Sequence, residues 1–435
     1  MLSRPLSVTL STQESSRVEK QAAATGLFQI AQSVVATQPV LRAANARVTI
    51  DEEKIEQTTA VDRFSASASF ESRREFEKSG TTLPFTSTST GLQGTLPIYR
   101  PQSASSIDAA RFQFESTRAL RLETESDLLA AVASTYFLAA LQATETRTLV
   151  AERQLLSEQR TVNERRLQGG VGTLVEVLET AARVDTLKGQ VRGSEGAEKN
   201  LLAELGRLAG APVDLVLTLR DESPAVVVPQ HASVALRAAE TGSARLVRLR
   251  RTLESARANI DVQRGAQLPT IDLVANVDRT RFQFDSLSTK TPSSALGVRI
   301  SLPIFSGGAT QSRIREALAQ TAISEEDVRG AELTLRSDIT KAYADLETAK
   351  SQASSNANGL AISQSALEAT MKAFRAGVRS NIDVLNAQQQ TFASQRELMR
   401  SRVAIQLAQT RILSLMGTLN LDSIALLARS LREGK

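Results

Sequence analysis

A stretch that decides the fold occurs twice in this chain: Gly170-Val171-Gly172-Thr173-Leu174-Val175-Glu176-Val177-Leu178 and, 207 positions later, Gly377-Val378-Arg379-Ser380-Asn381-Ile382-Asp383-Val384-Leu385. In each copy a glycine, which can take a positive φ after a helix, precedes a hydroxyl residue that can cap the next helix. In both copies an acid follows the hydroxyl residue by three positions and lies near the positive end of the next helix. In the first copy this acid is Glu176, which completes a capping box. Each copy therefore predicts the tight turn of a long antiparallel helical hairpin.

Proline placement predicts where the long helices lie. The runs 102–211 and 304–435 contain no proline, and a proline inside a helix costs about 3 kcal/mol. Apolar residues fall three or four positions apart in these runs, as at Leu128, Val132 and Tyr136. A helix of ~60 residues would be roughly 90 Å long, which predicts a coiled-coil rod or barrel in place of a compact domain.

The two hairpins belong to a duplication that covers nearly the whole chain. Leu96-Pro97-Ile98 matches Leu302-Pro303-Ile304, and Tyr136 matches Tyr343, with offsets between 206 and 210. The repeated unit is predicted to be helix, strand, strand, long helix, turn and helix. The predicted segments are a disordered tail at 1–15, a first repeat at 16–210, a connector at 211–230, a second repeat at 231–420 and a tail at 421–435.

The strand predictions rest on alternation with a period of two, as where Phe64, Ala66 and Ala68 alternate with serines. One apolar and one polar face is typical of a half-buried soluble sheet, and equally of a membrane barrel strand. The strands alone leave both readings open. The predicted strands lie at about 62–75, 87–99, 270–284 and 294–305, with Ser/Thr-rich loops at 78–89 and 285–294.

Composition argues against several classes of protein. Without cysteine the chain has no thiol nucleophile, cysteine metal site or lipidated N-terminal cysteine. Its 52 basic and 47 acidic residues are interleaved, so the excess is too diffuse to indicate nucleic-acid binding. Gly169-Gly170-Val171-Gly172 lacks the lysine and hydroxyl residue of a phosphate loop. We therefore expect no enzyme, no cofactor and no metal site.

At full length the chain resembles the TolC outer-membrane efflux protein family. The resemblance spans about 25–420 and rests on the two hairpin-tip stretches, on Asn386-Ala387-Gln388, on Leu-Pro-Ile-Phe-Ser-Gly-Gly at 302–308 and on the duplication. It implies a mainly α fold with a small β part, in which the hairpins form an α-barrel. It also implies a homotrimer in which each chain gives four strands to a twelve-stranded β-barrel in outer-membrane lipid.

The resemblance further implies a function and partners. The trimer would be the exit duct of a type I secretion or efflux system, located in the outer membrane with a periplasmic extension. A periplasmic adaptor protein would connect it to an inner-membrane pump or ABC transporter. The adaptor would meet the hairpin tips, which the resemblance places at about 168–174 and 375–381 and at Gly170, Val171, Gly172, Thr173, Gly377, Val378 and Ser380.

Gate residues also follow from the resemblance. Arg379 matches the family's gate arginine and Glu176 its acidic partner on a neighbouring hairpin. Val175 and Phe374 stand where the family can carry a threonine and a tyrosine that assist this link. Because neither has a hydroxyl, the expected gate reduces to one ion pair, worth about 0–1 kcal/mol if partly exposed.

A selectivity ring is implied at Asp383, where three copies converging on a narrow pore would favour cations. The family's second acid is replaced by Asn386, which implies a weaker cation trap. The residues themselves allow a simpler interpretation, in which Glu176 and Asp383 only stabilise helix N-termini.

A different class of protein also stays open. Residues 1–15 lack the apolar core of a secretory signal peptide, which favours a soluble coiled-coil scaffold or adaptor without a channel. The duplication and the alternating strands oppose that alternative.

Overall fold

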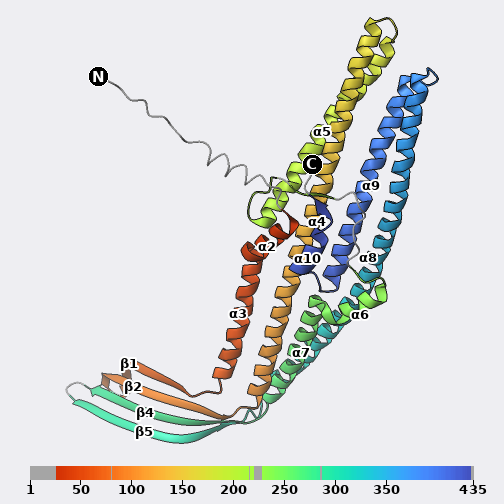
Figure 1. Cartoon of the computed structure of the whole chain (residues 1–435). Coiled ribbons are helices and arrows are strands. Elements are labelled where there is room, and N and C mark those ends of the chain that lie inside the picture. Colours follow the sequence, from red (N-terminus) through yellow and green to blue (C-terminus); the bar gives the residue numbers. More distant parts are fainter. Residues whose placement is uncertain (1–25, 80, 215, 220–227, 285–286, 433–435) are drawn as a thin grey trace, which may run out of the picture. The chain divides into compact units, whose positions relative to one another are not determined.

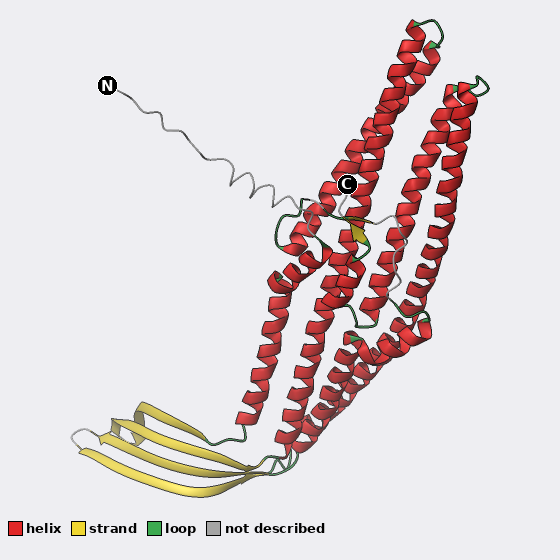
Figure 2. Ribbon diagram, viewed as in Figure 1, coloured by secondary structure: helices red, strands yellow, loops and turns green. Residues whose placement is uncertain are grey.

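The structure is a computed structural model that describes residues 26–79, 81–214, 216–219, 228–284 and 287–432. It is mainly helical with one four-stranded antiparallel sheet, as predicted (Figures 1 and 2). The predicted tail at 1–15 lies outside the described residues.

The two repeats have the same order of elements, which confirms the duplicated architecture. The first contains α2 (Leu27–Thr37), α3 (Pro39–Ala60), β1 (Ser65–Ser79), β2 (Thr81–Tyr99), α4 (Pro101–Gln168) and α5 (Leu174–Ala209). The second contains α6 (Ala232–Gly242), α7 (Ala244–Gly265), β4 (Thr270–Phe284), β5 (Leu287–Ser301), α8 (Ala309–Arg375) and α9 (Asn381–Leu415). The remaining elements are β3 (Thr218–Leu219), α10 (Leu421–Ala428) and β6 (Leu431–Arg432).

Contacts divide the chain into two compact units. One contains residues 44–121 and 245–331 and includes the large sheet, and the other contains the helical segments 122–244 and 332–435 together with the N-terminal part. The helices α4 and α8 run through both units because they are 68 and 67 residues long.

The large sheet has the order β1-β2-β4-β5, so β2 and β4 join the two repeats. Directly paired residues share a face. Leu92 pairs with Val277, and Val298 with Leu273, which places apolar residues on one face. Asp278 pairs with Gly91 and belongs to the opposite, more polar face. We refer to these as the apolar face and the polar face.

The predicted loops at 78–89 and 285–294 are wrong for residues 78–79, 81–89 and 287–294, while residues 80, 285 and 286 lie outside the described part of the chain. The β1–β2 ladder continues from Ser65 to Ser79 and from Thr81 to Thr95, and β5 begins at Leu287 and ends at Ser301. Serine and threonine were interpreted as loop residues, but threonine is β-branched and suits extended backbone. These segments do not alternate apolar and polar residues, so the sequence pattern did not indicate strands there. In the structure their ladders continue to the hairpin ends.

The predicted tail at 421–435 is also wrong over most of its length. Asn420 caps α10 by accepting a hydrogen bond from the Ser423 backbone. Ile424 and Leu427 are buried, and β6 pairs with β3 of the connector. A helix of eight residues has too few turns to show a clear helical period, which is why the sequence did not reveal it.

The apolar middle of α4 belongs to the core of the helical unit. In the described part of the chain α4 alone has an 18-residue window that could cross a membrane by length and composition, and 44% of that window is buried. Leu129, Val132 and Tyr136 are completely buried, so this part of α4 packs as a core helix does.

Equivalent tyrosines of the two repeats hold the connector between the repeats. The Tyr136 hydroxyl on α4 accepts a hydrogen bond from the Leu217 backbone N–H at 2.8 Å. The Tyr343 hydroxyl on α8 donates to the Pro229 carbonyl, also at 2.8 Å. Burial raises the pKa of Tyr136 to about 12, so its hydroxyl remains protonated at neutral pH. The duplication therefore supplies one anchor for each end of the connector.

Candidate functional site

The two hairpin turns have the same backbone geometry. Gly170 and Gly377 both have φ of 75°, a conformation that L side chains rarely adopt. The Thr173 hydroxyl accepts from the Glu176 backbone N–H at 3.3 Å, and the Ser380 hydroxyl accepts from the Asp383 backbone at the same distance. Both capping boxes are complete. The Asp383 carboxylate therefore accepts the hydrogen bond of the capping residue in the second turn, as the Glu176 carboxylate does in the first.

Each turn presents an exposed apolar side chain. Val171 is 72% exposed and Val378 is 76% exposed. The other predicted tip residues form the turns themselves: Gly170, Gly172 and Thr173 in the first, and Gly377 and Ser380 in the second. A rigid, capped turn with one projecting valine can bury apolar area against another protein without first having to become ordered.

The predicted gate residues lie in separate local interactions within one chain. The Glu176 carboxylate accepts from the Thr173 backbone N–H at 3.1 Å. Arg379 lies in the turn before α9, 4.0 Å from the Asp383 carboxylate in the first turn of that helix, and its side chain is largely exposed. Val175 is exposed. The Arg379–Glu176 ion pair therefore stays a prediction about contacts between neighbouring chains.

Phe374 joins the two hairpins, although it lacks a hydroxyl. The Arg166 guanidinium at the end of α4 lies over the Phe374 ring of α8, 5.4 Å from its centroid. A cation–π contact at an exposed site is worth about 0.5–1 kcal/mol. Phe374 therefore contacts the end of the first hairpin through its ring face, and its role in a gate stays a prediction.

The two predicted ring residues differ in their surroundings. Hydrogen bonds from the Ser380 backbone and hydroxyl, with the Arg379 guanidinium nearby, hold the pKa of the Asp383 carboxyl below its ordinary value. Asp383 is therefore ionised at neutral pH. The Asn386 amide oxygen accepts a hydrogen bond from Arg183 of α5 at 2.6 Å. Asn386 thus also connects the two hairpins.

A polar stripe on α4 extends this connection, and sequence reasoning missed it. The stripe consists of Glu145, Glu152, Gln159 and Arg166, spaced seven residues apart. Residues at heptad spacing stay on one face of packed helices, and each of these four contacts the second hairpin. Their partners are Arg400, Arg396 and Asn381 of α9 and Phe374 of α8. The heptad recurrence of polar residues was the signal that could have revealed it.

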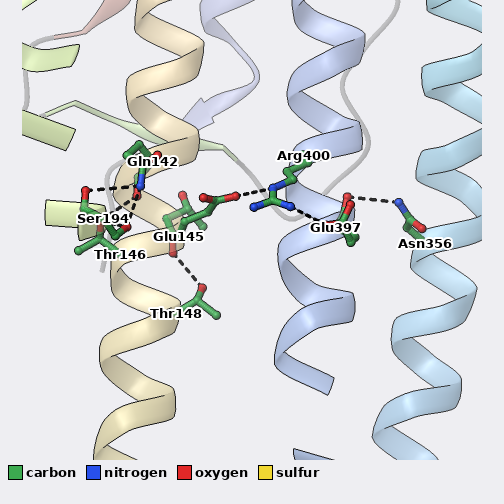
Figure 3. A network of polar contacts seen from close by, with 9 residues as sticks. Gln142, Glu145, Thr146, Thr148, Ser194, Asn356, Glu397 and Arg400 are labelled. Atoms are coloured by element: carbon green, nitrogen blue, oxygen red, sulfur yellow. Dashed lines mark hydrogen bonds and ion pairs between the residues drawn. The ribbon is translucent and has the colours of Figure 1, made fainter. Parts of the chain in front are cut away.

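One layer of the stripe connects all four long helices (Figure 3). Ser194 of α5 bonds Gln142 and Thr146 of α4. Glu145 of α4 accepts from Arg400 of α9 at 2.7 Å, and Arg400 also bonds Glu397. The Glu397 carbonyl accepts from Asn356 of α8 at 3.2 Å. The two hairpins are thus joined by charged and polar contacts.

The next layer is more buried. Glu152 and Arg396 form an ion pair at 2.8 Å with side chains that are 6% and 19% exposed. A cavity of ≈160 Å³ lies beside this pair, and Leu156, Leu187 and Gln388 are among its lining residues. The Gln388 amide oxygen is buried and has no hydrogen-bond partner among the described residues. An apolar cluster also crosses this interface, because Leu385 of α9 packs with buried residues of α4 and α5. The hairpins are therefore held by polar and apolar contacts, with a cavity between them.

The charged side chains of this site are arranged in pairs. Among the described residues no group of three or more His, Cys, Asp or Glu side chains could hold a metal ion. The polar contacts are paired for structure, as between Arg396 and Glu152.

We predict that Arg396→Ala strongly lowers the thermal unfolding temperature, because it leaves the buried Glu152 carboxylate unpaired at a cost of about 3–5 kcal/mol. Adding Glu152→Ala should recover part of the loss. The control is Lys372→Ala, which removes an exposed ion pair with Glu368 on α8 and should leave the temperature unchanged. Equal effects of Arg396→Ala and Lys372→Ala would contradict this interpretation.

Comparison with known proteins supports the expected resemblance. A family model described as "Outer membrane efflux protein" matches residues 30–211 and 235–418, one segment in each repeat. The outer membrane efflux protein BepC of Brucella suis is 27% identical over 75% of this chain and 71% of its own length. The alkaline protease secretion protein AprF of Pseudomonas aeruginosa is 26% identical over 71% of this chain and 65% of its own length.

Solved structures show the same fold at low identity. The structure of CusC covers 91% of this chain and 92% of its own, with a TM-score of 0.79 and 18% identity. The outer membrane protein VceC of Vibrio cholerae covers 90% of this chain and 96% of its own, with a TM-score of 0.74 and 17% identity. Because the family model matches well over half of the sequence, the chain belongs to the outer membrane efflux protein family and is an outer-membrane exit duct of an efflux or secretion system.

Proposed function

We propose that three copies of this chain close one twelve-stranded barrel in the outer membrane and continue it as a helical tunnel into the periplasm. The observation that carries the proposal is the sheet itself. In the described part of the chain β1 and β5 each pair on one side only. Lipid offers no hydrogen bonds to an open strand edge, so a spanning sheet has to close. Four strands per chain then require further copies.

The two faces of the sheet support the same arrangement. Val277, Leu296 and Val298 on the apolar face are exposed in the single chain, as expected of side chains that contact lipid. On the polar face the Asp272 carboxylate forms an ion pair with Arg100, and the side chain of Val274 is only 6% exposed. The polar face is thus the more enclosed one and suits a water-filled interior.

The proposed partners follow from the hairpin tips and from the absence of a nucleotide motif in the sequence. A periplasmic adaptor would contact the exposed Val171 and Val378, and an inner-membrane pump or ABC transporter behind it would supply the energy. The chain itself would conduct cargo without catalysis. Its relatives include a protease secretion protein, AprF, and an efflux protein, BepC, so the proposal covers both kinds of cargo.

The proposed gate depends on contacts between chains at the tips. Arg379 is exposed and its nearest acid lies at 4.0 Å, so it can reach an acid of a neighbouring chain at little cost. Glu176 of that chain would accept it. Such a pair is weak and could open when an adaptor engages the tips.

We predict that Arg379→Ser raises the single-channel conductance of the purified protein in planar bilayers, because the tip loses the cation that holds it closed. Arg375→Ser, which removes another basic residue close to the same turn, is the control and should leave conductance unchanged. An unaltered conductance of Arg379→Ser would remove this residue from the gate. A chain that forms no channels at all would contradict the duct and favour a soluble scaffold.

We predict that Asp383→Asn lowers cation preference, measured as the reversal potential in a salt gradient. Asparagine keeps an oxygen that can cap the helix but removes the charge, whereas Asp383→Glu keeps both and should retain the preference. Because the folded pKa of Asp383 is lowered, the preference should persist as pH falls to about 4 and be lost only at lower pH. Equal reversal potentials for both variants would exclude Asp383 from the filter.

A further inference from the structure

A group of basic residues borders the apolar face of the sheet. Arg279 and Arg281 lie on β4, and Lys290 lies directly opposite Arg281 on β5. All three share the face of Val277, because positions two apart along a strand point the same way. All three are exposed. We call them the basic row.

The basic row is not neutralised within the chain. None of its three side chains has a hydrogen bond or ion pair with another described residue. On the polar face, by contrast, Arg73 forms an ion pair with Glu71. Like charges directly opposite one another on neighbouring strands are destabilising, so Arg281 and Lys290 repel each other in the isolated chain.

The neighbouring residues on this face offer no acid. Arg279 has Thr90 on β2 and Pro292 on β5 as its direct partners. Arg281 has Thr88 on its other side. An anion that binds these three clustered cations would therefore come from outside the described part of the chain.

The position of the basic row indicates the source of that anion. The apolar residues Leu273 and Val277 occupy the half of β4 nearer α7, and Arg279 and Arg281 follow them toward the β4–β5 hairpin end. Once the apolar rows lie in lipid, the basic row lies at the level of the headgroups. It is the end of the strands opposite the one at which the chain connects to α7 and α8. In the proposed barrel, whose helices continue into the periplasm, that end lies at the outer leaflet.

We propose that Arg279, Arg281 and Lys290 bind the phosphate groups of anionic lipids in the outer leaflet. The proposal rests on the membrane barrel of the proposed function. A guanidinium can bind two phosphate oxygens at once, and an ammonium adds a point charge beside it. The acyl chains of the same lipid would lie on Val277 and Leu296, so headgroup and chains are held together.

The test is a titration of the purified, detergent-solubilised channel with phosphatidylglycerol and, separately, with phosphatidylcholine, followed by native mass spectrometry. The unsubstituted channel should prefer the anionic lipid. In the variant Arg279→Gln/Arg281→Gln/Lys290→Gln the affinity for phosphatidylglycerol should fall about 100-fold, as expected for three cations near an anionic surface. Phosphatidylcholine binding should change little. Arg279→Lys/Arg281→Lys, which keeps the charges, should retain much of the preference.

The matched control is Arg73→Gln/Arg299→Gln, which removes two cations from the polar face of the same sheet and should leave the lipid preference intact. A triple variant that keeps the full preference, or a control that loses as much as the triple variant, would overturn the proposal. Inorganic phosphate should compete poorly, because it has no acyl chain. If it displaces the lipid at equal concentration, the site binds free phosphate and the lipid assignment is wrong.

Failure of the lipid site and failure of the barrel have different signatures. The protein is also reconstituted into phosphatidylcholine vesicles and extracted with alkaline carbonate. A chain that resists extraction but shows no preference for phosphatidylglycerol overturns only the basic row. A chain that is released by carbonate contradicts the membrane barrel and the lipid site together.

Discussion

Backbone hydrogen bonding at the sheet edges is the constraint on which the rest of the structure depends. The sheet is complete in its interior, where β2 and β4 join the two repeats, but β1 and β5 have no second neighbour in the described part of the chain. In water such edges invite association, and in lipid they are not tolerated. The duplication therefore joins two hairpins into one sheet, and in the proposed assembly the outer strands of that sheet pair with those of further copies.

The helical unit holds its two hairpins together, and in the proposed gate the hairpin tips also have to separate. A fully apolar interface would bind the hairpins firmly at every contact. Here an apolar cluster that includes Leu385 of α9 is combined with the polar stripe on α4, which adds attraction at discrete points such as Glu152–Arg396 and Arg166–Phe374. The cavity beside the buried pair leaves the interface looser than a packed core. The buried ion pair Glu152–Arg396 lies away from the tips, whereas the Arg166–Phe374 contact lies near them.

The sequence predicted features that depend on local chemistry. The turn stretches specified both hairpins, because a glycine at positive φ and a hydroxyl cap act over a few residues. Features that depend on distant contacts were missed. The serine- and threonine-rich ends of β2 and β5 become strands only through their ladders, and α10 is stabilised by burying Ile424 and Leu427. Arg183 could not be assigned to Asn386 before the fold brought α5 and α9 together.

The most direct test of the proposed assembly is covalent capture of the sheet edges, and the chain contains no cysteine that would interfere. Ser67→Cys on β1 is combined in turn with Thr291→Cys, Ser293→Cys or Ala295→Cys on β5, and the membrane-inserted protein is oxidised and run under denaturing conditions. Pairing of β1 with β5 of a sibling predicts a ladder that ends at three chains, whereas each single substitution stays monomeric. A disulfide formed within one chain for every pair, with no larger species, would contradict the account.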